Sequence, residues 1–321
     1  MSRIDVHAHF VPGFYREALV AAGHARPDGI KAIPEWSAEE ALQTMDRLRV
    51  SRSYLSISSP GVHFGDDAAA ARLARRCNEE AAELAVRHPG RFGWFASVPL
   101  PDVDAAVAEA HHSLGRLGAD GIVLETNAHG QYLGNPALEP LYALAAERRV
   151  PVFVHPTTPY EAGHLALGYP RPMLEFLFET TRSITDLVLS GVLRRHEDLR
   201  VIVPHAGAAL PILANRIELL LPLLAEGGAT PPSMREALRA LHFDLAGAPV
   251  REMLDALLSV ADPDRIHYGS DYPFTPPDAC ARLAERLDTT DQLDGPLRAK
   301  IDSANAEALF SRRAREAGVL S

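Results

Sequence analysis

The sequence has little cysteine, fewer basic than acidic residues and no long apolar run, and each of these features disfavours a class of protein. Only Cys77 and Cys280 occur among 321 residues, far apart, so neither a disulfide framework nor a thiolate zinc site is predicted. The formal net charge of −10 disfavours broad electrostatic binding to nucleic acid or to an anionic membrane. We therefore expect a cytoplasmic protein with a small-molecule substrate and with neither nucleic acid nor membrane as a partner.

No run suggests a membrane span. The most apolar helix-like run, residues 217–225, is interrupted by Pro222 and is shorter than the roughly 20 residues needed to cross a bilayer. The chain enters a predicted strand directly, without the basic and apolar regions of a secretory signal. We expect a soluble protein without a cleaved signal.

Short β-branched or aromatic runs alternate with longer segments of helical periodicity. Eight strands are predicted, at residues 4–7, 53–58, 92–98, 121–125, 151–155, 201–205, 241–245 and 266–270. Strand followed by helix, repeated, is typical of parallel strands closed into a (β/α)8 TIM barrel. The length suits one such α/β domain, residues 1–321.

Two segments depart from the repeat. Residues 10–36, after the first strand, are rich in glycine and proline and too long for a simple loop, so a small flap over the barrel mouth is predicted. Residues 296–317 predict an extra C-terminal helix packed outside the barrel.

The most informative motif is His-Ala-His at positions 7–9, which ends the first predicted strand. Successive strand side chains point to opposite faces, so His7 and His9 project to one side and can bind one metal ion. His155, His205 and Asp271 each follow another predicted strand, and such positions converge on the mouth of a barrel. Imidazoles with a carboxylate suit one divalent ion, zinc first, with manganese or iron as alternatives.

The motifs around these residues are similar to those of a known family. They are His-Ala-His at 7–9, Val-Phe-Val-His-Pro at 152–156, Val-Pro-His-Ala-Gly at 203–207 and Tyr-Gly-Ser-Asp-Tyr-Pro at 268–273. Over nearly the whole chain the sequence resembles the amidohydrolase superfamily. Within it, the closest resemblance is to the decarboxylase branch of aminocarboxymuconate semialdehyde decarboxylase and the hydroxybenzoate decarboxylases. Residues 24–35, 56–61 and 91–102 are most similar to 6-methylsalicylate decarboxylases.

The resemblance implies roles for the residues that match. His7, His9, His155 and Asp271 would hold one divalent metal ion, and His205 would stand beside it as a proton-handling group.

Two arginines and a lysine distinguish members of the superfamily. Arg216 matches an arginine that reaches a substrate carboxylate in the neighbouring subunit's site, which implies a homodimer, although a solvated helix arginine is the alternative. A second family arginine has no counterpart near Gln43, which counts against aminocarboxymuconate semialdehyde as the substrate.

Binuclear members use a carboxylated lysine on strand four, whereas this chain has only Lys31 and Lys300. Glu125 ends that strand, and we favour a hydrogen-bonding wall residue over a bridge to a second ion.

The predicted reaction is a metal-dependent, non-oxidative decarboxylation of a small hydroxyaromatic acid, with 6-methylsalicylate giving 3-methylphenol (m-cresol) and CO2. Carboxylate and phenol oxygens of such a substrate can chelate the metal. Direct loss of CO2 would leave an aryl anion, so an acid must first protonate the ring carbon; Asp271 is our first choice and His205 the second. The alternative is a mononuclear hydrolase of a lactone, amide or ring carbonyl, in which His205 activates a metal-bound water.

Other residues carry weaker signals. Phe274 is predicted to contact the substrate, although core packing explains an aromatic residue there equally well. Four histidines in predicted loops either face the mouth or are merely solvated: His24, His63, His129 and His164.

Overall fold

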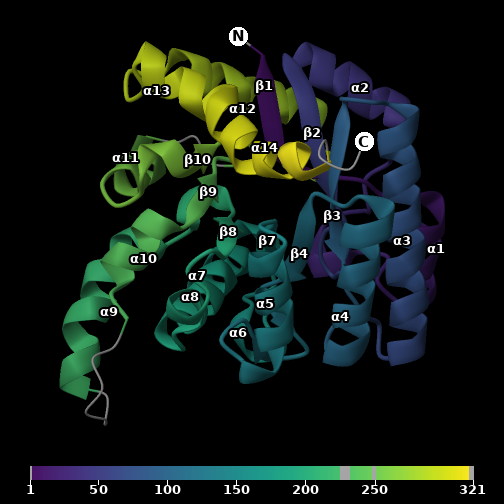
Figure 1. Ribbon diagram of the computed structural model, residues 1–321, viewed down its shortest axis with the longest axis horizontal. Coiled ribbons are helices and arrows are strands. Elements are labelled where there is room, and N and C mark those ends of the chain that lie inside the picture. Colours follow the sequence, from purple (N-terminus) through teal and green to yellow (C-terminus); the bar gives the residue numbers. More distant parts are fainter. Residues whose placement is uncertain (1, 225–231, 248–250, 318–321) are drawn as a thin grey trace.

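Eight parallel strands form the centre of a computed structural model, which describes residues 2–224, 232–247 and 251–317, with side chains described to residue 311 (Figure 1). They are β1 Arg3–His9, β2 Val50–Ser56, β3 Phe92–Ser97, β4 Gly121–Glu125, β7 Pro151–His155, β8 Arg200–Val203, β9 His242–Asp244 and β10 Ile266–His267. Neighbours in the sheet follow chain order. The Val6 N–H donates to the Tyr268 carbonyl at 3.0 Å, so the last strand region meets the first. The predicted TIM barrel is confirmed.

Helices surround the strands (Figure 1). The longer ones are α1 Gly13–Ala21, α2 Ala38–Arg47, α3 Asp67–Arg87, α4 Val103–His112, α5 Glu139–Glu147, α7 Glu175–Leu189, α9 Leu210–Leu224, α11 Arg251–Leu258, α12 Pro277–Thr289 and α14 Asn305–Ala317. The shorter ones are α6 Ala162–Leu165, α8 Val192–Arg195, α10 Met234–Ala240 and α13 Gly295–Ala299. Side chains of Ser37, Asp66 and Asp102 accept backbone N–H groups at the starts of α2, α3 and α4, which fixes where these helices begin.

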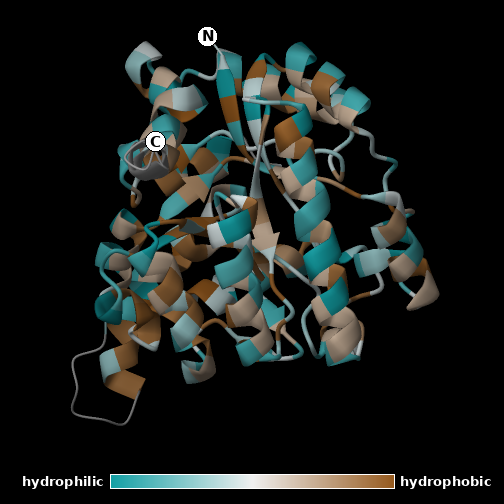
Figure 2. Ribbon diagram, turned by 45° about the vertical axis from the view of Figure 1, so that its right-hand side comes forward, coloured by the Kyte–Doolittle hydropathy of each residue, from teal (hydrophilic) through white to brown (hydrophobic). Residues whose placement is uncertain are grey.

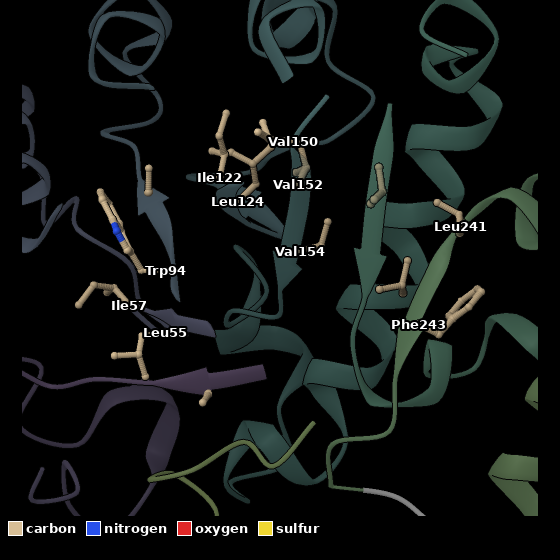
Figure 3. Packing of buried hydrophobic residues seen from close by; sticks show 14 of the residues in the cluster. Leu55, Ile57, Trp94, Ile122, Leu124, Val150, Val152, Val154, Leu241 and Phe243 are labelled. Carbon is tan, nitrogen blue, oxygen red and sulfur yellow. The ribbon is translucent and has the colours of Figure 1, made fainter. Parts of the chain in front are cut away.

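The barrel separates two hydrophobic clusters. The larger lies between strands and helices, and Figure 3 shows part of it, including Leu124 on β4, Val154 on β7 and Phe243 on β9. The smaller fills the barrel interior with Val6, Phe95, Phe153 and other buried residues.

The predicted extra C-terminal helix is present as α14, and its Leu309 and Phe310 pack into the interior cluster. The Phe310 ring stacks on Tyr54 with ring centres 3.7 Å apart. Arg200, the first residue of β8, donates from Nη1 to the Leu309 carbonyl at 3.3 Å, so α14 supports the barrel at the end opposite the strands' carboxyl ends.

Two connections near the mouth are more ordered than the sequence indicated. Residues 10–36 contain α1 and a short 3-10 turn, Pro27–Gly29, and the Tyr15 hydroxyl donates to the Gly61 carbonyl at 2.7 Å in the loop after β2. After β4, a small hairpin of β5 Asn127–Ala128 and β6 Gln131–Tyr132 was not predicted. Its turn contains His129 and Gly130, both with positive φ.

Helix α9 is unusually apolar for an exposed helix. By length and composition alone, the segment His205–Leu224 could cross a membrane. It is longer than the apolar run 217–225 that the sequence indicated. Residue 225 of that run lies outside the described residues. Length and composition are weak evidence for a membrane span in this segment, because it begins at His205 and forms part of the connection between β8 and β9. Exposed fractions are 71% for Ile212 and Leu219 and 76% for Leu223. Figure 2 shows this helix in brown at the lower left.

Candidate metal centre and active site

Two histidines of β1 begin the site. His7 and His9 are fully buried, and their Nε2 atoms lie 3.2 Å apart. The opposite ring nitrogen of each is held, because His7 Nδ1 lies 2.9 Å from Oδ2 of Asp244 and His9 Nδ1 lies 2.9 Å from Oγ of Ser56. These contacts orient both Nε2 atoms towards one point, as partners of metal-binding histidines do.

Two further donors come from other strands. Asp271, four residues beyond β10, places Oδ1 3.2 Å from His9 Nε2 and 3.5 Å from His7 Nε2. His155 ends β7, and its ring centre lies 4.7 Å from that of His9. One possible ligand atom from each of these four residues lies within 4.8 Å of the other three. Three buried imidazoles and one partly buried carboxylate, converging on one point, fit a divalent cation.

His205 lies beside this cluster, with its ring centre 5.1 Å from that of His7. Its backbone has a φ of 54°, and its N–H donates to Asp244 Oδ1 at 3.1 Å. Gly247 leaves room for the ring, since a Cβ there would lie 3.3 Å from His205 Cδ2. Nδ1 of His205 is buried without a hydrogen-bond partner among the described residues. Burial and the charge of His7 lower the pKa of His205, so its ring is neutral and can accept or relay a proton.

Sequence reasoning missed Asp244. Its carboxylate accepts the ring N–H of His7 as well as the backbone N–H groups of His205 and Ala246. The available signal was a carboxylate within an apolar predicted strand, where a charge needs partners. Asp244 therefore connects a predicted metal ligand to the predicted proton-handling histidine.

Two opposing effects set the pKa values in the cluster: burial disfavours each ionised form, and a neighbouring group of opposite charge favours it. Burial disfavours the ionised form of Asp271, yet hydrogen bonds from His7 and His9 hold the pKa of its carboxyl well below the usual value. Burial likewise opposes protonation of His7, but the charge and hydrogen bond of Asp244 raise the pKa of His7 to about 10. Burial and the charges of His9 and His7 hold the pKa of His155 well below its usual range.

Glu125 contacts the cluster at His155. Its Oε2 lies 3.6 Å from Nδ1 of His155, and both atoms are buried without a hydrogen-bond partner in the part of the chain that the structure describes. Burial, followed by the charge of Asp28, raises the pKa of Glu125 well above its usual value. Glu125 thus lies next to His155 and not at the point where the four donors converge.

The remaining predicted residues lie at different distances from the cluster. The Phe274 ring packs edge-on against His9, with centres 5.5 Å apart. Arg216 is exposed on α9, and within the described residues no hydrogen bond, ion pair or ring contact joins it to the cluster. His24, His63 and His129 line a neighbouring cavity, whereas the side chain of His164 is 86% exposed.

The sequence matches known proteins over almost its full length. The family model described as amidohydrolase matches residues 4–312. A 6-methylsalicylic acid decarboxylase of Aspergillus aculeatus is 40% identical over 290 residues, which cover 88% of this chain and 87% of that protein. Another, from Penicillium expansum, is 36% identical over 317 residues and 97% of both chains.

Solved structures share the fold. The crystal structure of an amidohydrolase II superposes with a TM-score of 0.91 at 34% identity, over 97% of this chain and 100% of that one. A 2,6-dihydroxybenzoate decarboxylase complexed with 2,6-dihydroxybenzoate superposes with a TM-score of 0.81 at 24% identity, over 97% and 99% of the two chains.

Proposed function

Because the chain belongs to the amidohydrolase family, we propose that it is a metal-dependent, non-oxidative decarboxylase of a small hydroxyaromatic acid. The observation that carries this proposal is the convergence of His7, His9, His155 and Asp271 within 4.8 Å of one another. Two relatives at 40% and 36% identity are named 6-methylsalicylic acid decarboxylases, which supports 6-methylsalicylate as the substrate and 3-methylphenol and CO2 as the products.

A divalent ion held by these four residues would supply positive charge that binds and polarises the carboxylate and phenol oxygens of the substrate. The donor set accepts zinc, manganese or iron, and zinc is the first ion to test. Phe274, whose ring packs on His9, is proposed to contact the aromatic ring of the substrate.

The chain must deliver one proton to the ring carbon that carries the carboxylate. Asp271 is the proposed donor, since its side chain is 19% exposed while those of its partners His7 and His9 are fully buried. Because hydrogen bonds from these histidines hold the pKa of its carboxyl low, Asp271 must take up a proton before it can donate one. The Thr275 hydroxyl donates to Asp271 Oδ2 at 3.1 Å and fixes the carboxyl group. His205, with its unpartnered Nδ1, is the second candidate. As the carbon gains the proton, its bond to the carboxylate breaks, the electron pair of that bond returns to the ring, and CO2 leaves.

The active form is proposed to be a homodimer that pairs through α9. Ile212, Arg216, Leu219 and Leu223 are spaced so that they share one helix face, and the three apolar members are at least 71% exposed. Covering this face with a second copy would bury the apolar side chains and present Arg216 to the partner. A Leu219→Asp, Leu223→Asp variant should then sediment as a monomer. A dimer of unchanged stability would contradict this interface.

A cytoplasmic location is also proposed. Its support is that Cys77 and Cys280 are both free and buried, which is consistent with a reducing compartment.

The test of function is CO2 release from a panel of hydroxybenzoates, led by 6-methylsalicylate, with metal content measured on the same samples. The His7→Ala, His9→Ala double variant, folded by circular dichroism, is expected to lose bound metal and CO2 release together. If the metal-loaded protein releases no CO2 from any hydroxybenzoate but opens lactones or amides, the hydrolase alternative replaces the decarboxylase.

A further inference from the structure

A cavity of about 490 Å³ lies next to the metal cluster. Loops after β2, β3 and β7 and the hairpin β5–β6 form its walls. The side chains that line it are largely apolar, among them Ile57, Val62, Phe64, Val98 and Leu100. Cavities of this size and lining are typical of small-molecule sites.

Glu125 connects this cavity with the metal cluster. It lines the cavity, and its Oε2 lies 3.6 Å from Nδ1 of His155. Thr157, two residues after His155, lines the same space. A substrate held at the cluster therefore has this cavity on the side of His155.

The rim of the cavity is polar. His63 Nδ1 lies 2.7 Å from His129 Nε2, and His63 Nε2 lies 2.8 Å from Asp67 Oδ1. This chain of contacts ties the loop after β2 to the hairpin β5–β6. The His24 ring packs on Phe64, with centres 5.4 Å apart. Three of the four loop histidines noted in the sequence thus border the cavity, which is apolar within and polar at its edge.

The cavity is far larger than a methyl group requires. At the roughly 30 Å³ that a water molecule occupies in the liquid, it has room for about sixteen waters, whereas a methyl group replaces about one. A benzoate ring that entered it would still leave much of the apolar wall uncovered.

We infer that this cavity receives an extended apolar substituent on the substrate ring. The preferred substrates are then salicylates with an unbranched alkyl chain of several carbons in place of the methyl group of 6-methylsalicylate. This inference rests on the proposed decarboxylase function and specifies its substrate class.

The test compares 6-methyl-, 6-propyl- and 6-pentylsalicylate with the metal-loaded enzyme. Each buried methylene is expected to lower KM by up to about fourfold. The product 3-pentylphenol should correspondingly inhibit at lower concentration than 3-methylphenol. If kcat/KM instead falls from methyl to propyl and pentyl, the inference is overturned while the decarboxylase function stands. If none of the three releases CO2, the proposed function itself fails, and the inference fails with it.

A Val98→Phe variant, which narrows the cavity, tests where the chain binds. It should lower kcat/KM for the pentyl substrate at least tenfold more than for the methyl substrate. Val86→Phe is the matched control, because Val86 is 80% exposed on α3, and both substrates should keep their constants. Ala128→Phe narrows the cavity from the hairpin and replaces Val98→Phe if that variant does not fold. Equal effects of the folded cavity variant on both substrates would contradict the assignment.

Discussion

The barrel contains two groups of buried histidines whose surroundings differ. At the carboxyl ends of the strands, His7 and His9 place Nε2 atoms 3.2 Å apart with an oxygen of Asp271 within 3.5 Å of both. Elsewhere in the barrel, His242 Nδ1 lies 2.9 Å from His267 Nε2. His242 and His267 form a simple hydrogen-bonded pair. In the first group, two imidazole nitrogens and a carboxylate oxygen, all possible metal ligands, approach one another, and hydrogen bonds among them cannot satisfy all three atoms.

The charged side chains in direct contact with the two groups are of opposite sign. Asp244 and Asp271 contact the first group, and His7 consequently has a pKa raised to about 10 despite its burial. Arg265 Nη1 lies 3.0 Å from His242 Nε2, and burial, despite the charge of Asp244, lowers the pKa of His267 to about 4. Burial of histidine therefore does not by itself mark a metal site. What distinguishes the candidate metal site is a carboxylate oxygen of Asp271 close to the Nε2 atoms of both His7 and His9.

Asp271→Asn, which preserves the side-chain shape and removes the carboxylate, should have the largest effect. Loss of the proposed proton donor should lower kcat roughly 10²- to 10⁴-fold. Stopped-flow or coupled assays of CO2 release at saturating metal measure this change, with bound metal quantified in parallel. His267→Gln, in the other histidine group, should leave kcat within twofold. An Asp271→Asn enzyme of near-normal kcat would transfer the proton-donor role to His205.

Asp244→Asn should have a smaller effect of a different kind. The amide can no longer hold the ring of His7 as a carboxylate does, so metal affinity should fall roughly 10- to 100-fold. Titration with a metal buffer measures the affinity, and excess metal should restore much of the activity. The matched Asp278→Asn change removes an exposed carboxylate that pairs with Arg47 and should alter neither quantity. Unchanged metal affinity in Asp244→Asn would show that Asp244 only supports the backbone of His205.

The sequence predicted those parts of the molecule that depend on local pattern. Each of the eight strand regions contains a strand, because alternating β-branched and helical segments mark a βα repeat. The convergence of His7, His155 and Asp271 could be foreseen because each follows a strand, and strand ends in a barrel share one face.

The parts that were missed depend on contacts between distant segments. Asp244 ends a three-residue strand, and its partnership with His7 depends on how β9 and β1 are placed on either side of β10. The cavity beside His155 depends on the paths of several loops, which no single motif encodes. The proposed role of Arg216 depends on a second copy of the chain and stays a prediction.

The smallest expected effect concerns stability and the second histidine group. His267 is buried with a pKa lowered to about 4, against an ordinary value of 6.5. Below pH 6.5 the unfolded chain binds a proton that the folded chain does not, so stability is lost as pH falls from 6.5 towards 4. By pH 5.5 this amounts to about 1 kcal/mol.

His267→Gln isolates this contribution, since the glutamine side-chain oxygen can still accept from His242 Nδ1 but the side chain does not titrate. Urea unfolding of metal-free protein at pH 7.5 and pH 5.5 is the measurement, because metal binding would add its own pH dependence. The variant should lose about 1 kcal/mol less than the original chain between these two values. Equal losses would mean that His267 is protonated in the folded barrel, and the contrast between the two histidine groups would then be one of geometry and not of charge.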